Sequence, residues 1–205
     1  MGKNPLRAVD TPLFAGTLRH LHSQKRKSFP SLAIIGAPTI RGLKAATLIN
    51  FKRGDEDVRS VWEARSADWL APLGLECILL NEGIASRNAL VMLYKRNILE
   101  RALRDEAAKG ILASLGYPLP DLDGCLWHLR ARYRREFPHE IGLFLDYPPE
   151  DVRGFMEHRK AKRHIDGYWK VYGDVKKARR IFQHYRRAER DAAWSLMDGF
   201  NTGTG

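Results

Sequence analysis

The spacing of apolar residues predicts two helices in the middle of the chain. From Ile98 to Leu115 the apolar positions recur three or four residues apart, as on one face of a single amphipathic helix, and Gly116 follows as a stop. The same spacing recurs after residues 117–120 and predicts a second helix, with Asp121 or Asp123 as its cap. Each helix therefore has one face suited to burial.

A long amphipathic helix is predicted near the C-terminal end, with Asp174 as its cap. Apolar residues from Val175 to Ala188 recur on one face and predict that this face points inward. The opposite face is basic and carries Lys176, Lys177, Arg179, Arg180, Arg186, Arg187 and Arg190.

Strands are predicted where short apolar runs lie between polar links. Leu75–Leu80 and Ala89–Tyr94 are two such runs, and the polar link between them favours an antiparallel pair. Tyr168–Tyr172 alternates like a strand, and Gly173 ends it. Together with the helices, these runs predict an α+β fold, a single domain in which several helices cover a small antiparallel sheet.

The stretch Phe137–Phe155 predicts two short helices around a tight turn. Pro138 and Pro149 suit the first position of a helix, where a missing N–H costs nothing. Asp146 tolerates the left-handed conformation that a sharp helix stop requires. The segment 138–159 is therefore helix-turn-helix-like, with Val152 on the buried face of its second helix.

Length and composition are those of one globular domain. We place this domain at residues 30–200 and expect a short helix within it at Ser60–Leu70. Residues 1–29 are expected to form an arm or a short helix before the domain, and residues 201–205 a frayed tail after it. No apolar run is long enough to cross a bilayer, and the first ten residues lack the apolar segment of a secretory signal. The only cysteines are Cys77 and Cys125, so we expect free thiols and a cytoplasmic protein without a cysteine-based metal site.

The net charge of +11 is unevenly distributed, because residues 130–190 carry 17 Lys and Arg against 9 Asp and Glu. Such a concentration of positive charge favours nucleic acid or an anionic small molecule as a partner. A basic face that only contacts solvent explains it equally well.

The glycine-containing piece Gly36–Lys44 resembles a phosphate-binding loop but has the wrong spacing. Leu43 stands between the second glycine and Lys44, and Ala45 replaces the hydroxyl residue of a nucleoside-triphosphate loop. Arg41 and Lys44 remain candidates for a simpler anion site. The favoured alternative is a turn with two solvent-facing cations.

His139 and Glu140 are the main candidates for a ligand site, because histidine is suited to proton transfer or ligation near neutral pH. Arg153 is a further candidate because the helix pattern gives it no structural role. Trp169 is another, because aromatic residues of this region can form a pocket wall, although such residues more often form the core. In the alternative interpretation His139 packs locally, and Glu140 satisfies the helix start or pairs with an arginine from 130–135. No Ser/His/Asp or Cys/His arrangement predicts a reaction, and no cofactor is indicated.

Nucleic-acid binding through 138–159 is a second hypothesis. The N-terminus of its second helix would enter the major groove, but Glu150 and Asp151 stand there and would be repelled by phosphates. The candidate contacts are therefore cations elsewhere: Arg159, Lys160, Lys176, Lys177, Arg179, Arg180 and Arg187. We therefore interpret residues 138–159 first as a local packing motif and only second as a DNA-binding motif. A protein-interaction module with an acidic partner is a third hypothesis.

Three motifs make the chain similar to a family of uncharacterised bacterial proteins, over about residues 33–187. They are Phe137–Phe155, matching FPHEIGxFLGYPxEDVxGF, then Tyr168–Asp174 with WKVYGD, and Ala37–Lys44. Asp146 stands where that family usually has glycine, and a basic linker precedes Trp169 where many relatives have cysteines. The resemblance implies a domain of unknown function and no mechanism. We therefore favour a small-molecule, anion or cofactor-binding role centred on the FPHEIG segment.

Overall fold

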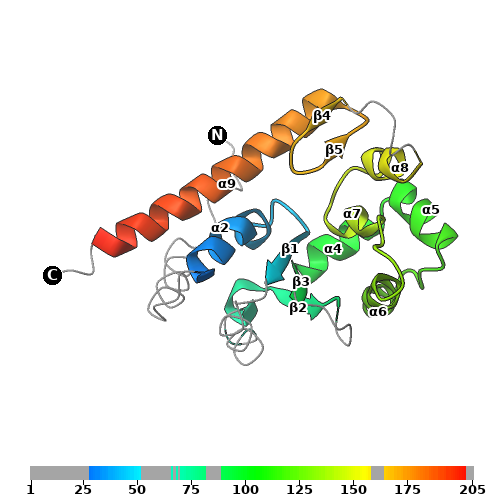
Figure 1. Ribbon diagram of the computed structural model, residues 1–205, viewed down its shortest axis with the longest axis horizontal. Helices are drawn as coiled ribbons and strands as arrows, with labels where there is room; N and C mark the ends of the chain where they lie inside the picture. The colour runs from blue at the N-terminus through cyan, green and yellow to red at the C-terminus, as the bar shows by residue number, and fades with distance from the viewer. Residues whose placement is uncertain are drawn as a thin grey trace, which may run out of the picture.

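The computed structural model describes residues 28–51, 66, 68, 70–81, 89–157 and 164–201, which form one α+β domain, as the sequence predicts (Figure 1). In chain order its elements are α2 (Ser28–Ile40), β1 (Ala46–Phe51), the 3-10 helix η2 (Ala71–Leu73), β2 (Glu76–Leu79), β3 (Ala89–Tyr94), α4 (Arg96–Leu103), α5 (Glu106–Ser114), α6 (Leu122–Tyr133), α7 (Ile141–Phe144), α8 (Pro149–Glu157), β4 (Ile165–Asp166), β5 (Lys170–Val171) and α9 (Val175–Asn201).

The three-stranded sheet is antiparallel, with the order β1-β3-β2. The predicted pair of strands is confirmed as β2 and β3, and β3 lies at the centre, where Val91 faces Ile49 on one side and Leu79 on the other. Strand β1 is not predicted by the sequence pattern. Both faces of that strand are covered, so its residues do not alternate clearly between apolar and polar.

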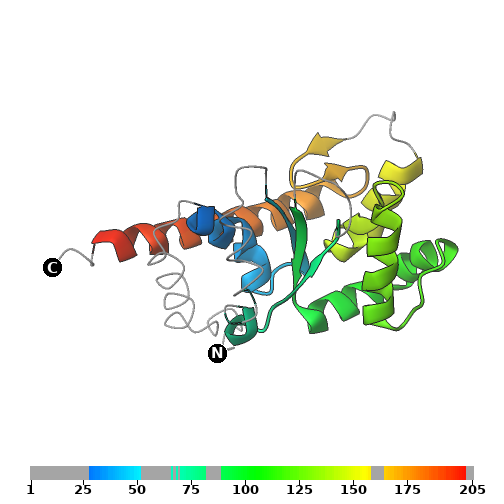
Figure 2. The ribbon, with the colours of Figure 1, turned by 60° about the horizontal axis from the view of Figure 1, so that its bottom comes forward.

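Helices cover both faces of the sheet, because successive strand residues point to opposite sides (Figure 2). Val91 and Leu93 face α2 and α9, where they join Ala37, Ala188 and other small residues in one core cluster. Met92 and Tyr94 point the other way into a larger cluster, formed with α4–α8. The long helix α9 runs beside α2, and its C-terminal end extends beyond that helix (Figure 1).

The single helix predicted over Ile98–Leu115 is wrong, because the chain forms two helices there. Asp105 interrupts the run with an extended backbone, and its carboxylate accepts hydrogen bonds from Ala107 N at 3.0 Å and Ala108 N at 3.1 Å. An aspartate that caps a new helix in this way satisfies two N–H groups that have no partner within it. Gly116 adopts a φ of 78°, so the predicted stop is present.

The two helices predicted around Asp146 are present, but the first is a single turn, α7. Pro138 does not begin it: Ile141 N donates to Pro138 O at 3.1 Å, which places the proline in the preceding turn. Pro149 does begin α8, and Asp146 has the predicted left-handed backbone, with φ of 62°. The helix-turn-helix interpretation of 138–159 stays a prediction.

The strand predicted at Tyr168–Tyr172 is reduced to β5, which pairs with β4 in a short antiparallel hairpin. This hairpin and the first half of α9 form a third core cluster around Trp169, Val171 and Phe182. The hairpin therefore joins α9 to the region of α8.

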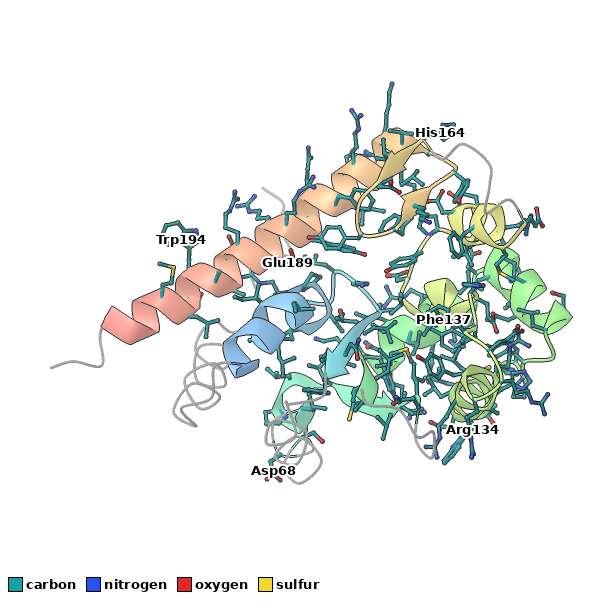
Figure 3. All side chains as sticks on the ribbon, viewed as in Figure 1. Asp68, Arg134, Phe137, His164, Glu189 and Trp194 are labelled. Carbon is teal, nitrogen blue, oxygen red and sulfur yellow. The ribbon has the colours of Figure 1, made fainter. Side chains whose placement is uncertain are left out.

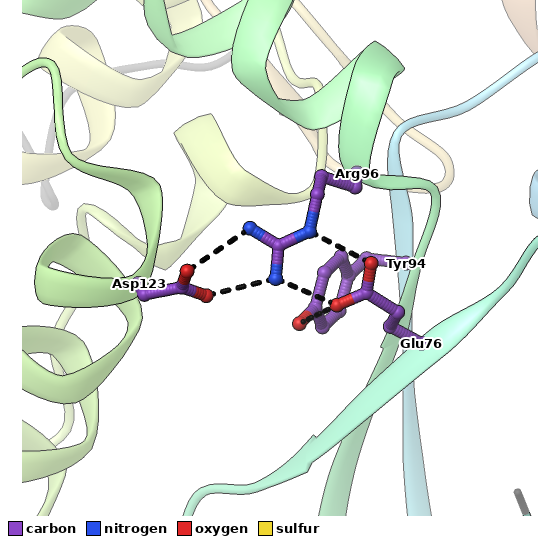
Figure 4. A network of polar contacts seen from close by, with 4 residues as sticks. All are labelled: Glu76, Tyr94, Arg96 and Asp123. Carbon is purple, nitrogen blue, oxygen red and sulfur yellow. Dashed lines mark hydrogen bonds and ion pairs between the residues drawn. The ribbon is translucent and has the colours of Figure 1, made fainter.

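An arginine and two carboxylates connect the sheet to the helices on its surface (Figure 4). Arg96, at the start of α4, donates two hydrogen bonds of 2.8 Å to Glu76 of β2 and bonds of 2.8 and 3.2 Å to Asp123 of α6. Tyr94 donates to the same Glu76 at 2.9 Å. Asp123 thus connects α6 to α4 through Arg96. Of the two predicted caps of α6, Asp121 is the one that occupies the cap position.

Several predictions fall outside the described residues: the arm up to residue 27, most of Ser60–Leu70, the cations Arg159 and Lys160, and the tail beyond Asn201. Ser66, Asp68 and Leu70 are helical. Helix α2 already begins at Ser28, and α9 continues to Asn201. Of the helices that the structure describes, α9 included, none has the length and apolar character needed to span a membrane.

Candidate functional site

A cavity of about 320 Å³ lies between α7, α8, β1 and the β4–β5 hairpin. Its wall is almost entirely apolar. The residues that line it are Leu48, Phe137, His139, Ile141, Gly142, Leu145, Tyr147, Asp151, Val152, Phe155, Trp169 and Lys170. Most of them belong to the stretch 137–155, so the conspicuous sequence motif builds the greater part of the wall.

His139 stands in an aromatic surround at the edge of this cavity. Its ring centroid lies 5.4 Å from that of Phe137 and 5.1 Å from that of Phe155, and the Phe155 contact is edge-on. The side chain is half-buried, and it has further polar or ring contacts. The imidazole is thus held by packing while it borders the cavity.

Lys170 brings a positive charge to the same place. Its ammonium lies 5.2 Å from the centroid of the Phe155 ring, which is within the range of a cation–π contact. The residue is exposed, and it belongs to the lining. His139, in the turn before α7, and Lys170, in β5, therefore both approach Phe155, although they are far apart in the sequence.

Asp151 fixes the wall formed by the hairpin. The residue is 2% exposed, and its carboxylate accepts three hydrogen bonds of 2.7 Å: one at Oδ2 from Trp169 Nε1, and two at Oδ1 from Tyr172 N and Gly173 N. From the sequence, this residue is predicted only to place a negative charge at a helix start. Its partners lie 18 to 22 residues further along the chain, and no local pattern reports them.

Glu140 does not line the cavity; it stabilises the segment that precedes α7. It is 1% exposed, and its Oε1 accepts hydrogen bonds from Arg132 Nε and, at 2.9 Å, from the Tyr117 hydroxyl. A buried carboxylate needs such partners. The alternative interpretation, in which Glu140 pairs with an arginine from 130–135, therefore describes this residue correctly.

Gly142 allows α7 and α8 to approach closely beside the cavity. A Cβ atom at this position would lie 2.8 Å from Val152 Cγ2 and 3.2 Å from Tyr147 Cδ2. Real Cβ atoms essentially never show a contact as short as 2.8 Å, so Val152 or the backbone of the two helices would have to shift to accept a larger residue.

Lys44 lies beside Tyr147, a residue of the cavity wall, but does not itself line the cavity. Tyr147 stacks on Trp169 with a centroid separation of 4.9 Å, and the Lys44 ammonium lies 5.5 Å from the Tyr147 ring and 5.9 Å from the Tyr185 ring. Burial lowers the pKa of Lys44 to about 8, although Asp146 and Glu189 oppose that shift. The favoured interpretation of Lys44 as a solvent-facing cation is therefore wrong, since the residue is only 7% exposed.

The remaining candidate residues do not meet at the cavity. Arg41 donates to Asp191 of α9 at 2.8 Å, and Gly42 next to it has the positive φ of the predicted turn. Arg153 is exposed on α8 and is not part of the lining. The candidates for nucleic-acid contact on α9 are exposed: Lys176, Lys177, Arg179, Arg180 and Arg187. Within the described ranges, no group of three or more His, Cys, Asp or Glu is placed to hold a metal ion.

Fold and site define a small α+β domain with an apolar cavity beside a helix-turn motif. The chain belongs to the family described as "Protein of unknown function (DUF3793)", which matches residues 32–203. The resemblance inferred from the motifs is thereby confirmed at the level of a family without an established activity. No curated protein and no solved structure matched the chain.

Proposed function

We propose that the protein binds a small molecule with an apolar, preferably aromatic, body and one anionic group. The observation that carries this proposal is the apolar cavity whose polar groups include His139 and Lys170. Its volume of about 320 Å³ falls at the lower end of the range of roughly 300–1,000 Å³ that small-molecule sites occupy.

The chemistry of the lining separates the two parts of such a ligand. The rings of Phe137, Phe155 and Trp169 offer flat apolar surface to the ligand body. The ammonium of Lys170 attracts a carboxylate, sulfonate or phosphate, and the His139 ring can donate a hydrogen bond to it. Asp151 lines the cavity too, but its two oxygens are already occupied by three donors.

This proposal takes precedence over DNA recognition by 138–159 for a structural reason. In that mode the N-terminus of α8 would enter a groove. In this protein the first turn of α8 packs against its own hairpin: Asp151 binds Tyr172 N and Gly173 N, and a Cβ on Gly173 would lie 2.7 Å from Glu150 Cγ.

Titration with 8-anilino-1-naphthalenesulfonate tests the proposal, because the dye has an aromatic body and one sulfonate. We expect saturable binding to the folded protein, with energy transfer from tryptophan, since Trp169 lines the cavity. His139→Ala and Lys170→Gln should each weaken binding by about tenfold, the equivalent of one charge-assisted hydrogen bond.

His184→Ala and Lys109→Gln are the matched controls, because both residues lie outside the cavity lining. Urea unfolding of every variant separates a lost contact from a loosened fold, since the dye also binds partly unfolded chains. Equal affinity for the wild type, the cavity variants and the controls would contradict the proposal.

A further inference from the structure

The outward side of α9 forms a continuous stripe of exposed residues, which we call the α9 stripe. It consists of Lys176, Arg179, Arg180, Gln183, Arg187, Arg190, Trp194 and Met197, all of them exposed. These positions follow one another at intervals of one, three or four residues, so they share one face of a helix with 3.6 residues per turn. The stripe is separate from the cavity described above.

Positive and negative side chains of α9 lie on different sides of the helix: the cations of the stripe point outward, and the carboxylates face the rest of the protein. Glu189 and Asp191 are the only carboxylates of residues 175–197, and both are held by the body of the protein. Glu189 accepts a hydrogen bond of 2.6 Å from the Tyr168 hydroxyl, and Asp191 accepts one of 2.8 Å from Arg41. Figure 3 shows Glu189 on the side of α9 that faces α2, whereas Trp194 stands on the opposite side.

Among the described residues, the cations of the stripe form no close ion pair, although Arg180 attracts Asp174 from a longer distance. Within the part of the chain that the structure describes, no carboxylate lies within ion-pair distance of Lys176, Arg179, Arg180, Arg187 or Arg190. Lys176 stands three and four residues before Arg179 and Arg180, and Arg187 stands three before Arg190. Like charges at these spacings destabilise a helix, so the unpartnered protein carries a repulsion that an external anion would relieve.

Trp194 adds a flat apolar surface at the end of the basic row. It is 59% exposed, and Met197 beside it is 57% exposed, although the opposite face of α9 buries Ala192 and Leu196 against the core. A polyanion alone needs no aromatic residue. Unpaired bases do, since they stack on exposed aromatic side chains and contribute to binding in a way that tolerates any sequence.

We propose that the α9 stripe binds single-stranded nucleic acid, with phosphates along the arginines and a base on Trp194. From Lys176 to Trp194 the helix rises about 27 Å, so the row can follow several successive phosphates. Four of its five cations are arginines, whose planar guanidinium groups bind phosphate oxygens in pairs. A duplex would satisfy the cations but leave the indole without a stacking partner, because its bases already stack on each other.

Fluorescence anisotropy with a labelled oligo-dT of about 20 nucleotides tests the proposal, since such a strand exceeds the site sizes of about 4–16 nucleotides known for single-strand binders. We expect binding at about 50 mM salt that weakens steeply as salt is added. The triple variant Arg180→Gln, Arg187→Gln, Arg190→Gln should reduce the slope of log affinity against log salt by about 2, or about 0.7 for each lost phosphate contact.

Two matched controls isolate the stripe from general charge and from general tryptophan exposure. Arg101→Gln, Arg134→Gln, Arg135→Gln removes the same charge from exposed positions on α4 and after α6, and it should leave the slope unchanged. Trp127 is 60% exposed on α6, so Trp127→Ala should be neutral, whereas Trp194→Ala should weaken binding at least about fivefold.

Several results would overturn the proposal. They are the absence of binding at low salt, an equal loss in the two triple variants, and equal losses for the two tryptophans. Equally tight binding to a duplex of the same length would remove the single-strand assignment. Stripe-dependent binding to phosphatidylserine vesicles, without binding to the oligonucleotide, would assign the surface to a membrane instead.

Discussion

Asp151→Asn tests whether one buried carboxylate holds the β4–β5 hairpin against α8. In the wild type, Oδ2 accepts from the Trp169 indole, and Oδ1 accepts from the backbone N–H groups of Tyr172 and Gly173, directly after β5. An asparagine has nearly the same shape, and its single oxygen can still serve the two backbone donors. Its amide group would then face the indole N–H, so two donors would point at each other.

The magnitude follows from the bonds that change. The indole loses a hydrogen bond to a charged acceptor, worth about 1.5–3 kcal/mol, and the remaining two bonds lose their charge assistance. The loss of a negative charge from the first turn of α8 contributes about 0.3–1 kcal/mol more. We therefore expect Asp151→Asn to lower the free energy of unfolding by about 2–4 kcal/mol.

Urea denaturation measures this change, and Trp169→Phe provides a double-mutant cycle. Phenylalanine has no N–H to oppose the asparagine amide, so Asp151→Asn should cost about 1–2 kcal/mol less in that background. Glu150→Gln is the matched control: it removes a charge from the same turn of α8, but from an exposed side chain, and should cost less than about 1 kcal/mol.

A cost below about 0.5 kcal/mol for Asp151→Asn would place this residue among ordinary surface positions and refute the reasoning. A cost equal to that of Glu150→Gln would attribute the effect to the helix dipole alone.

Three further substitutions test the packing around the cavity. Gly142→Ala should destabilise by about 1–3 kcal/mol in urea, because its Cβ would lie 2.8 Å from Val152 Cγ2, and Val152→Ala should recover part of that loss. Glu140→Gln should cost about 1–3 kcal/mol by the same measurement, since Arg132 loses its buried charged partner; an unchanged midpoint would show that the pair is not needed. Burial lowers the pKa of Lys44 to about 8 from its ordinary 10.5, so the unfolded chain binds more protons between these values and stability rises with pH there. In Lys44→Met that rise, at most about 3 kcal/mol, should be absent, and equal pH profiles of the two proteins would show that Lys44 is charged and solvated when folded.

The residues that could be predicted from sequence are those whose conformation is fixed locally. Asp146 follows a short apolar helix and precedes Tyr147-Pro148, a dipeptide that disfavours helix, and it has the predicted left-handed backbone. Gly116 and Pro149 likewise end and begin helices as predicted. The break at Asp105 was missed because the apolar spacing continues through it, although aspartate followed by Glu106 is itself a helix-start signal.

The sequence predicted only part of the candidate site. The stretch 137–155, which the sequence singles out, contains His139 and most of the residues that line the cavity. Lys170 and Asp151 were not recognised, because their roles depend on the hairpin returning to α8. Lys44 was placed in solvent because a lysine in a turn usually lies there, whereas two tyrosines from distant segments enclose it.

By itself, then, the sequence determined the order and type of most elements, the antiparallel pair of β2 and β3, the stops around Asp146 and the two-sided character of α9. These properties depend on periodicity and on turn residues within about one or two helical turns of chain. Tertiary structure alone decided which side chains meet: Asp151 with Trp169, Glu140 with Tyr117, and Arg41 with Asp191. Those pairs are separated by 18, 23 and 150 residues, and a charged residue looks the same in the sequence whether it will face solvent or a buried partner.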